Sequence, residues 1–161
     1  MSVESHEQNV SRIPESDRFL EMLALWAEFG LSIPVTLTFH GLRASGMMIG
    51  TAAYFSKLSV YMKSTANLSG EGALSMKATV DSIFDGIASD AKTARENETL
   101  EKALENQSYP AFIHLDDAAF FTADGLCTMN QSSILWRCRI SEVVGFSLGA
   151  MRPGQDPHRR G

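Results

Sequence analysis

Two stretches of alternating apolar and polar residues, one in each half of the chain, constrain the fold more than any other feature of this sequence. Residues 35–39 (VTLTF) alternate with period two and are rich in β-branched side chains, and residues 42–49 follow as a returning strand. Residues 134–140 (ILWRCRI) place apolar side chains on one face and two arginines on the other. Both patterns predict half-buried strands of an antiparallel sheet.

Two further strands are predicted from the same kind of pattern. Residues 112–121 (FIHLDDAAFF) alternate again, and residues 146–148 form a short strand after a glycine. Gly46 lies inside the returning strand at 42–49, where a glycine predicts a bulge or a sharp bend.

Helical spacing marks the other regions of the chain. An apolar stripe over residues 19–29 predicts a helix, with Ser16 as its N-terminal cap and Gly30 as a left-handed stop. Stripes over residues 52–64 and 80–91 predict two more helices. Residues 90–106, charged and poor in large apolar groups, are typical of a solvated helix face.

These segments together predict an α+β fold with a helix before five short strands and a helical insertion, about 52–108, between the second and third strands. Five short strands are closed most economically by a small, bent antiparallel β-barrel of the Sm or SH3 kind. We expect one domain over residues 15–149, a disordered leader at 1–14 and a disordered tail at 150–161.

Composition excludes several classes of protein. The chain has 161 residues, 44% hydrophobic, with two cysteines and a formal net charge of −5. This acidic balance argues against a nucleic-acid coat and against binding to an anionic membrane. Two cysteines make no disulfide framework, no apolar run reaches the ~18 residues of a membrane span, and no secretory signal pattern occurs. We therefore expect a cytoplasmic protein.

Catalytic and metal-binding patterns are weak in this chain. Residues 145–149 (GFSLG) match the nucleophile-elbow pattern around Ser147, but Pro153 and Pro157 leave no room for the helix that an elbow requires. Cys127 and Cys138 stand apart, without the spacing that places two metal ligands together. The sequence therefore predicts no catalytic residue, no metal and no cofactor.

Polar side chains on two strands form another candidate site. His114 and Asp116 share one face of their strand, and Arg137 and Arg139 share one face of theirs. If the two strands pair, these groups meet either as a cross-strand ladder of ion pairs or as a recognition surface. Met47 belongs to an adaptable contact surface or to the core.

Two blocks of the sequence together resemble a known family. The first block is the amphipathic segment FLEMLALWAEFG (19–30) followed by VTLTFHGLRASGMMIGTAAYF (35–55). The second block is FIHLDDAAFFTADG (112–125) followed by SSILWRCRISEVVGFSLG (132–149). This order is similar to that of the gas vesicle accessory protein U (GvpU) family, and the closing W-R-x-R…G-F-x-L-G segment is its most specific part. The resemblance implies a non-enzymatic accessory protein that associates with gas vesicle shell proteins, self-associates as a homo-oligomer and promotes vesicle clustering.

On this interpretation the candidate binding residues are Arg137, Arg139, Asp116, Asp117 and Met47, with Trp136 and Phe146 supporting the barrel. Two other classes stay open. An Sm-like RNA-binding ring would gather the two arginines around a pore, and a small hydrolase or ligand-binding domain would use Ser147 or Cys127.

Overall fold

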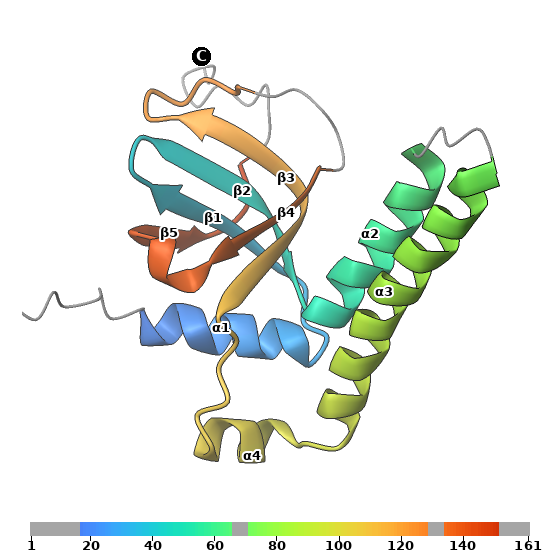
Figure 1. Cartoon of the computed structure of the whole chain (residues 1–161). Coiled ribbons are helices and arrows are strands. Elements are labelled where there is room, and N and C mark those ends of the chain that lie inside the picture. Colours follow the sequence, from blue (N-terminus) through green and yellow to red (C-terminus); the bar gives the residue numbers. More distant parts are fainter. Residues whose placement is uncertain (1–16, 66–70, 129–133, 152–161) are drawn as a thin grey trace, which may run out of the picture.

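The computed structural model describes residues 17–65, 71–128 and 134–151. Its centre is a five-stranded antiparallel sheet in the order β4-β3-β2-β1-β5, strongly bent in Figure 1. The strands are β1 (Ile33–Phe39), β2 (Leu42–Ile49), β3 (Phe112–Thr122), β4 (Ile134–Arg139) and β5 (Gly145–Leu148). All five strands lie where the alternation predicts them, and the α+β class is confirmed.

Four helices accompany the sheet, and three of them are inserted between β2 and β3, as predicted. Helix α1 precedes the sheet and lies across one end of it, whereas α2 and α3 form a long hairpin beside it (Figure 1). A short 3-10 turn, η1, joins β4 to β5. The bounds are α1 (Arg18–Glu28), α2 (Thr51–Thr65), α3 (Glu71–Glu96), α4 (Leu100–Glu105) and η1 (Ile140–Glu142).

The predicted barrel does not close. A barrel requires hydrogen bonding between its first and last strands, but β4 and β5 are the two outer strands of the sheet. Within the described ranges, β5 is four residues long and pairs with β1 alone, and β4 pairs with β3 alone. The Sm-like and SH3-like barrel is therefore corrected to an open, bent sheet.

The hydrophobic core lies between the concave face of the sheet and helix α1. Every second residue of the central strands points into it, and Trp136 of β4 packs against the same cluster from the outer strand. Burial of these side chains is the main stabilising term of the fold. The core residues are Leu20, Leu23, Ala24, Ala27, Ile33, Val35, Leu37, Ala44, Met48, Ile113, Leu115, Ala118 and Ile140.

The bend that Gly46 predicts is present, but the extra residue belongs to the neighbouring strand. The register between β2 and β3 shifts between Ser45 and Met47. Asp117 of β3 has a φ of 50°, in the left-handed region, as the first residue of one class of bulge does. A Cβ on residue 46 would lie 2.8 Å from the Asp116 carbonyl oxygen. Only glycine therefore fits against the bulge.

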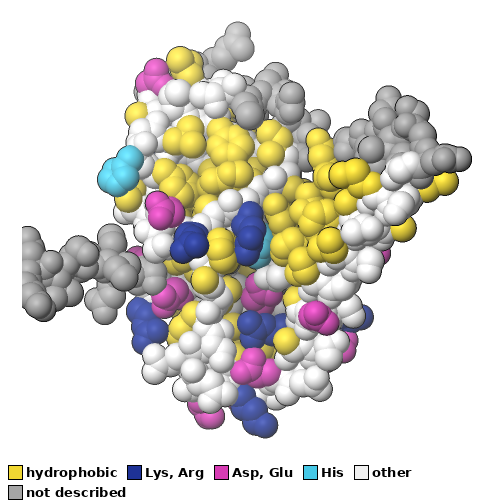
Figure 2. Space-filling model, viewed as in Figure 1, with side chains coloured by type: hydrophobic (Ala, Val, Ile, Leu, Met, Phe, Trp, Pro, Cys, Tyr) yellow, Lys and Arg dark blue, Asp and Glu magenta, His cyan; other side chains and the backbone are white. Residues whose placement is uncertain are grey.

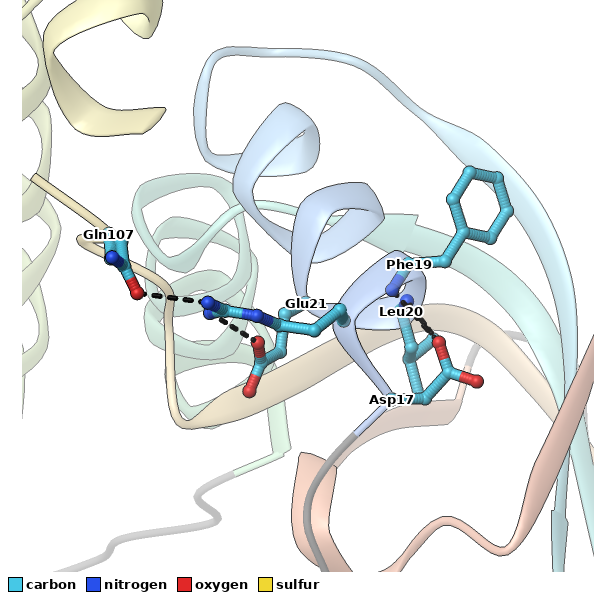
Figure 3. A network of polar contacts seen from close by, with 6 residues as sticks. Asp17, Phe19, Leu20, Glu21 and Gln107 are labelled. Carbon is cyan, nitrogen blue, oxygen red and sulfur yellow. Dashed lines mark hydrogen bonds and ion pairs between the residues drawn. The ribbon is translucent and has the colours of Figure 1, made fainter. Parts of the chain in front are cut away.

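Helix α1 is fixed at its start by polar contacts, which Figure 3 shows. The Asp17 carboxylate accepts hydrogen bonds from the backbone N–H groups of Phe19 and Leu20, so Asp17 is the N-terminal cap. The expected cap, Ser16, lies outside the described residues. Arg18 donates to the Gln107 side-chain oxygen at 2.9 Å and so connects α1 to the segment between α4 and β3.

The end of α1 also positions the helical hairpin. The Glu28 carboxylate accepts a hydrogen bond from the Thr51 hydroxyl at 2.6 Å and from the Thr51 backbone N–H at 3.1 Å. A carboxylate in this place accepts hydrogen bonds from N–H groups that lack a partner within the helix at the start of α2. Its negative charge also interacts favourably with the positive end of the helix dipole. The left-handed stop predicted at Gly30 is confirmed by its φ of 96°.

The predicted leader at 1–14 lies outside the described residues, and so does the predicted tail at 150–161 beyond Met151.

Candidate functional site

The pairing of β3 with β4 brings the predicted polar patch together. Arg137 lies opposite His114, and Arg139 lies opposite Phe112. Because cross-strand partners point to the same face of a sheet, all four side chains share the face that helix α2 approaches. We call the exposed part of this face, formed by Arg137, Arg139, Phe112 and Phe55 of α2, the arginine surface.

Both arginines stack on one aromatic ring. The Arg137 guanidinium carbon lies 3.6 Å from the centre of the Phe112 ring and 6.0 Å from that of Phe55. The Arg139 guanidinium carbon lies 5.6 Å from the Phe112 ring. Such cation–π contacts contribute about 0.5–1 kcal/mol each at exposed sites. Among the described residues, neither arginine forms an ion pair with a carboxylate.

A buried histidine lies next to this surface. His114 is only 2% exposed, and its ring centre lies 4.6 Å from that of Tyr54 and 6.1 Å from that of Phe55. Its Nε2 atom has no hydrogen-bond partner in the described part of the chain. Burial, together with the positive charge of Arg137, lowers the pKa of His114 to about 4, so the imidazole is neutral near pH 7.

The acidic residues of the patch contact other groups. Asp116 forms an ion pair of 3.0 Å with Lys57 of α2 instead of meeting the arginines, so the ion-pair ladder that the alternation allowed is not observed among the described residues. Asp117 is exposed at the bulge, and Met47 is half-buried opposite Asp116 on the neighbouring strand. The ion pair with Lys57 thus occupies the Asp116 carboxylate, and none of the ion pairs in the described ranges joins it to an arginine.

The residues considered for catalysis lie elsewhere. Ser147 is exposed on β5, and Cys138 lies half-buried on the core-facing side of β4. Burial and the nearby Glu142 carboxylate raise the pKa of the Cys138 thiol to about 12, which keeps it neutral and a poor nucleophile. In residues 17–65, 71–128 and 134–151, no cluster of three or more His, Cys, Asp or Glu side chains is placed to hold a metal ion.

Figure 2 shows how this face of the molecule is divided. Apolar side chains gather over the sheet and again over the helical hairpin, and basic side chains lie between these two areas. The hairpin carries several large exposed apolar groups, among them Leu74 at 76% and Val60 at 66% exposed. Exposed apolar areas of this kind commonly mark interaction surfaces.

Sequence reasoning missed the aromatic part of the site. Tyr54 and Phe55 were recognised as members of a helical stripe, and Phe112 as a member of an alternating strand. Neither pattern says which strand the helix will pack against. One signal was available in the sequence: Phe112 and His114 are two residues apart on one strand, and the two arginines are two residues apart on the other. If these strands pair in the right register, each arginine therefore lies beside one of the two ring side chains.

We expect His114 to make the folded state sensitive to acid. Its folded pKa lies below the unfolded value near 6.5, so between pH 6.5 and 4 the unfolded chain binds the proton more strongly. Stability should therefore fall with decreasing pH in this window, by on the order of 3 kcal/mol. Urea unfolding as a function of pH measures this loss, and His114→Gln should flatten the curve.

His40→Gln is the matched control, because His40 is exposed between β1 and β2. An unchanged pH profile in the His114→Gln protein, or the same flattening in the His40→Gln protein, would contradict this assignment.

Comparison with known families decides where this fold belongs. A family model described as "Gas vesicle protein GvpU-like" matches residues 17–151, which span all the helices and strands described above. The chain belongs to the GvpU-like family of gas vesicle proteins. The resemblance drawn from the sequence is thereby confirmed. No curated protein and no solved structure matches this GvpU-like chain.

The family assignment makes this GvpU-like chain a gas vesicle-related protein. Within the described ranges, none of its helices combines the length and apolarity that crossing a bilayer requires.

Proposed function

We propose that this protein is a non-enzymatic gas vesicle accessory protein that attaches to vesicle shell proteins in the cytoplasm. It promotes clustering of the vesicles through self-association. The observation that carries the proposal is the family match over residues 17–151. Two features support it, because both suit binding better than chemistry: the exposed apolar groups of the helical hairpin, and the arginine surface, whose charges have no carboxylate partner among the described residues.

Attachment and clustering are two separate steps, and we propose a different surface for each. We assign attachment to the polar residues around β3 and β4, namely Arg137, Arg139, Asp116 and Asp117, with Met47 beside them. We assign self-association to the apolar side chains of α2 and α3. Met76 and Ile83 of α3 are 61% and 53% exposed, and seven residues of separation place them on one helix face.

Flotation tests attachment directly. Purified vesicles rise on centrifugation, so a bound protein rises with them, and light scattering with electron microscopy then reports clustering. If attachment is electrostatic, raising the salt concentration should release the protein. Failure of the purified chain to float with vesicles at low salt would refute the proposal.

We expect the double variant Met76→Gln with Ile83→Gln to attach normally but to cluster vesicles at least about tenfold less efficiently. Burial of one such side chain contributes on the order of 1.5–3 kcal/mol, and 1.4 kcal/mol corresponds to a factor of ten in association. Light scattering of vesicles titrated with each protein measures the effect.

Leu126→Gln with Val144→Gln is the control, because Leu126 and Val144 are 67% and 55% exposed but lie away from the hairpin. Equal loss in the two double variants would show that general surface hydrophobicity, and not the hairpin, drives clustering.

A further inference from the structure

Strand β4 is an outer strand of the sheet, with β3 on its inner side. The backbone N–H and C=O groups on its outer side therefore have no neighbouring strand within the described ranges. Such an edge can accept an extended peptide, whose main chain then continues the hydrogen-bonded ladder. β4 consequently offers main-chain recognition in addition to its side chains.

The side chains of β4 specify the charge of a partner. Arg137 and Arg139 are exposed, point to one face, and lack a carboxylate partner among the described residues. Contact with the Phe112 ring restrains both guanidinium groups before any partner arrives. Restraint of this kind lowers the entropic cost of forming the paired hydrogen bonds that arginine makes with a carboxylate.

The pleat of the sheet then fixes the pattern of the partner. In a strand added beside β4, the two side chains level with Arg137 and Arg139 point to the arginine surface. The side chain between them points to the opposite face, where Trp136 and Cys138 are half-buried and apolar. The peptide segment that complements β4 therefore has three consecutive residues in the order acidic, apolar, acidic.

We propose that the outer edge of β4 binds an extended segment of a partner protein in which two carboxylate side chains flank an apolar one. This inference rests on the proposed function, since it specifies the chemistry of the partner that the arginine surface meets. A second copy of this chain fits less well, because neither of its outer strands, β4 (Ile134–Arg139) or β5 (Gly145–Leu148), carries a carboxylate.

Fluorescence anisotropy with the full chain tests the charge requirement. The probe is a fluorescein-labelled, C-terminally amidated peptide of sequence VEVEV, and VQVQV is its uncharged counterpart. We expect VQVQV to bind about tenfold more weakly, because two charge-assisted contacts are lost. Arg137→Gln with Arg139→Gln should weaken VEVEV binding by a similar factor.

Lys77→Gln with Lys92→Gln is the matched control, since it removes the same charge from exposed positions on α3. It should change VEVEV binding by less than about twofold, because distant exposed charges are screened. Circular dichroism establishes that each variant is folded. If the arginine variant does not fold, the comparison of VEVEV with VQVQV on the unaltered chain decides the question.

Backbone methylation of the peptide tests strand addition. Alternate residues of a strand direct their N–H groups to the same edge. Methylation of one alternate set of amides should abolish VEVEV binding, whereas methylation of the other set should leave it within about twofold. Equal effects of the two sets would overturn strand addition.

Vesicle flotation with the same preparations separates this inference from the proposed function. Equal binding of VEVEV and VQVQV overturns the inference even if the protein attaches to vesicles. Selective VEVEV binding without attachment to vesicles overturns the proposed function alone. If the arginine variant keeps full VEVEV affinity and only self-associates more, the arginines protect the edge from aggregation, and the inference is wrong.

Discussion

Replacement of Gly46 by alanine is expected to lower the free energy of unfolding by about 3 kcal/mol. The new Cβ would lie 2.8 Å from the Asp116 carbonyl oxygen and 3.2 Å from the Ala118 Cα. Both neighbours are backbone atoms of the β3 bulge, so relief requires β2 and β3 to separate and not merely a side chain to rotate. Urea unfolding followed by far-ultraviolet circular dichroism measures the change.

Gly86→Ala is the matched control for this prediction. Gly86 lies within helix α3, and a Cβ built on it meets nothing within 4 Å. Alanine has a higher helix propensity than glycine, so this variant should gain about 0.5–1 kcal/mol of stability. A Gly46→Ala protein as stable as the unaltered chain would show that the bulge adjusts easily and does not require glycine.

Leu37→Ala should be comparably destabilising, by about 3 kcal/mol, for a different reason. Leu37 is 0% exposed and lies in β1, between β2 and β5, with its side chain in the hydrophobic core. Truncation removes buried methyl groups and leaves a cavity that surrounding strands cannot fill without losing their own pairing. The same urea titration measures the loss, which should appear as a lower midpoint with an unchanged slope.

Leu74→Ala provides the comparison, because Leu74 is 76% exposed on α3 and should tolerate the change within about 0.5 kcal/mol. If Leu37→Ala lowered the free energy of unfolding no more than Leu74→Ala does, the principal core could not lie between the described sheet and α1.

The secondary structure was largely predictable because alternation and helical spacing are local properties of the chain. Each of the five strands was placed within two residues at its N-terminal end, and Gly30 and Gly46 marked a helix stop and an irregularity correctly. Closure of the sheet was not predictable in this way. It depends on whether β4 and β5 hydrogen-bond to each other, which is a contact between whole elements and not a feature of either strand.

The candidate site was predictable only in outline. The sequence placed Arg137 and Arg139 on one face of their strand and Asp116 on one face of a different strand. It left open whether the arginines would contact the carboxylate. Asp116 pairs with Lys57 of α2, and the register of β3 with β4 sets both arginines against Phe112. Aromatic contacts therefore replaced the ion-pair ladder.

Strand and helix positions and the family to which the chain belongs follow from the order of residues, because each depends on neighbours in sequence or on a recognisable motif. The requirement for glycine at 46 arises from its contact with the β3 bulge. Tertiary structure alone decided that the sheet stays open, that His114 is buried beside Tyr54, and that two arginines stack on Phe112 along an outer strand. These features depend on register and packing between segments far apart in the chain, where a shift of one residue would turn every side chain to the opposite face.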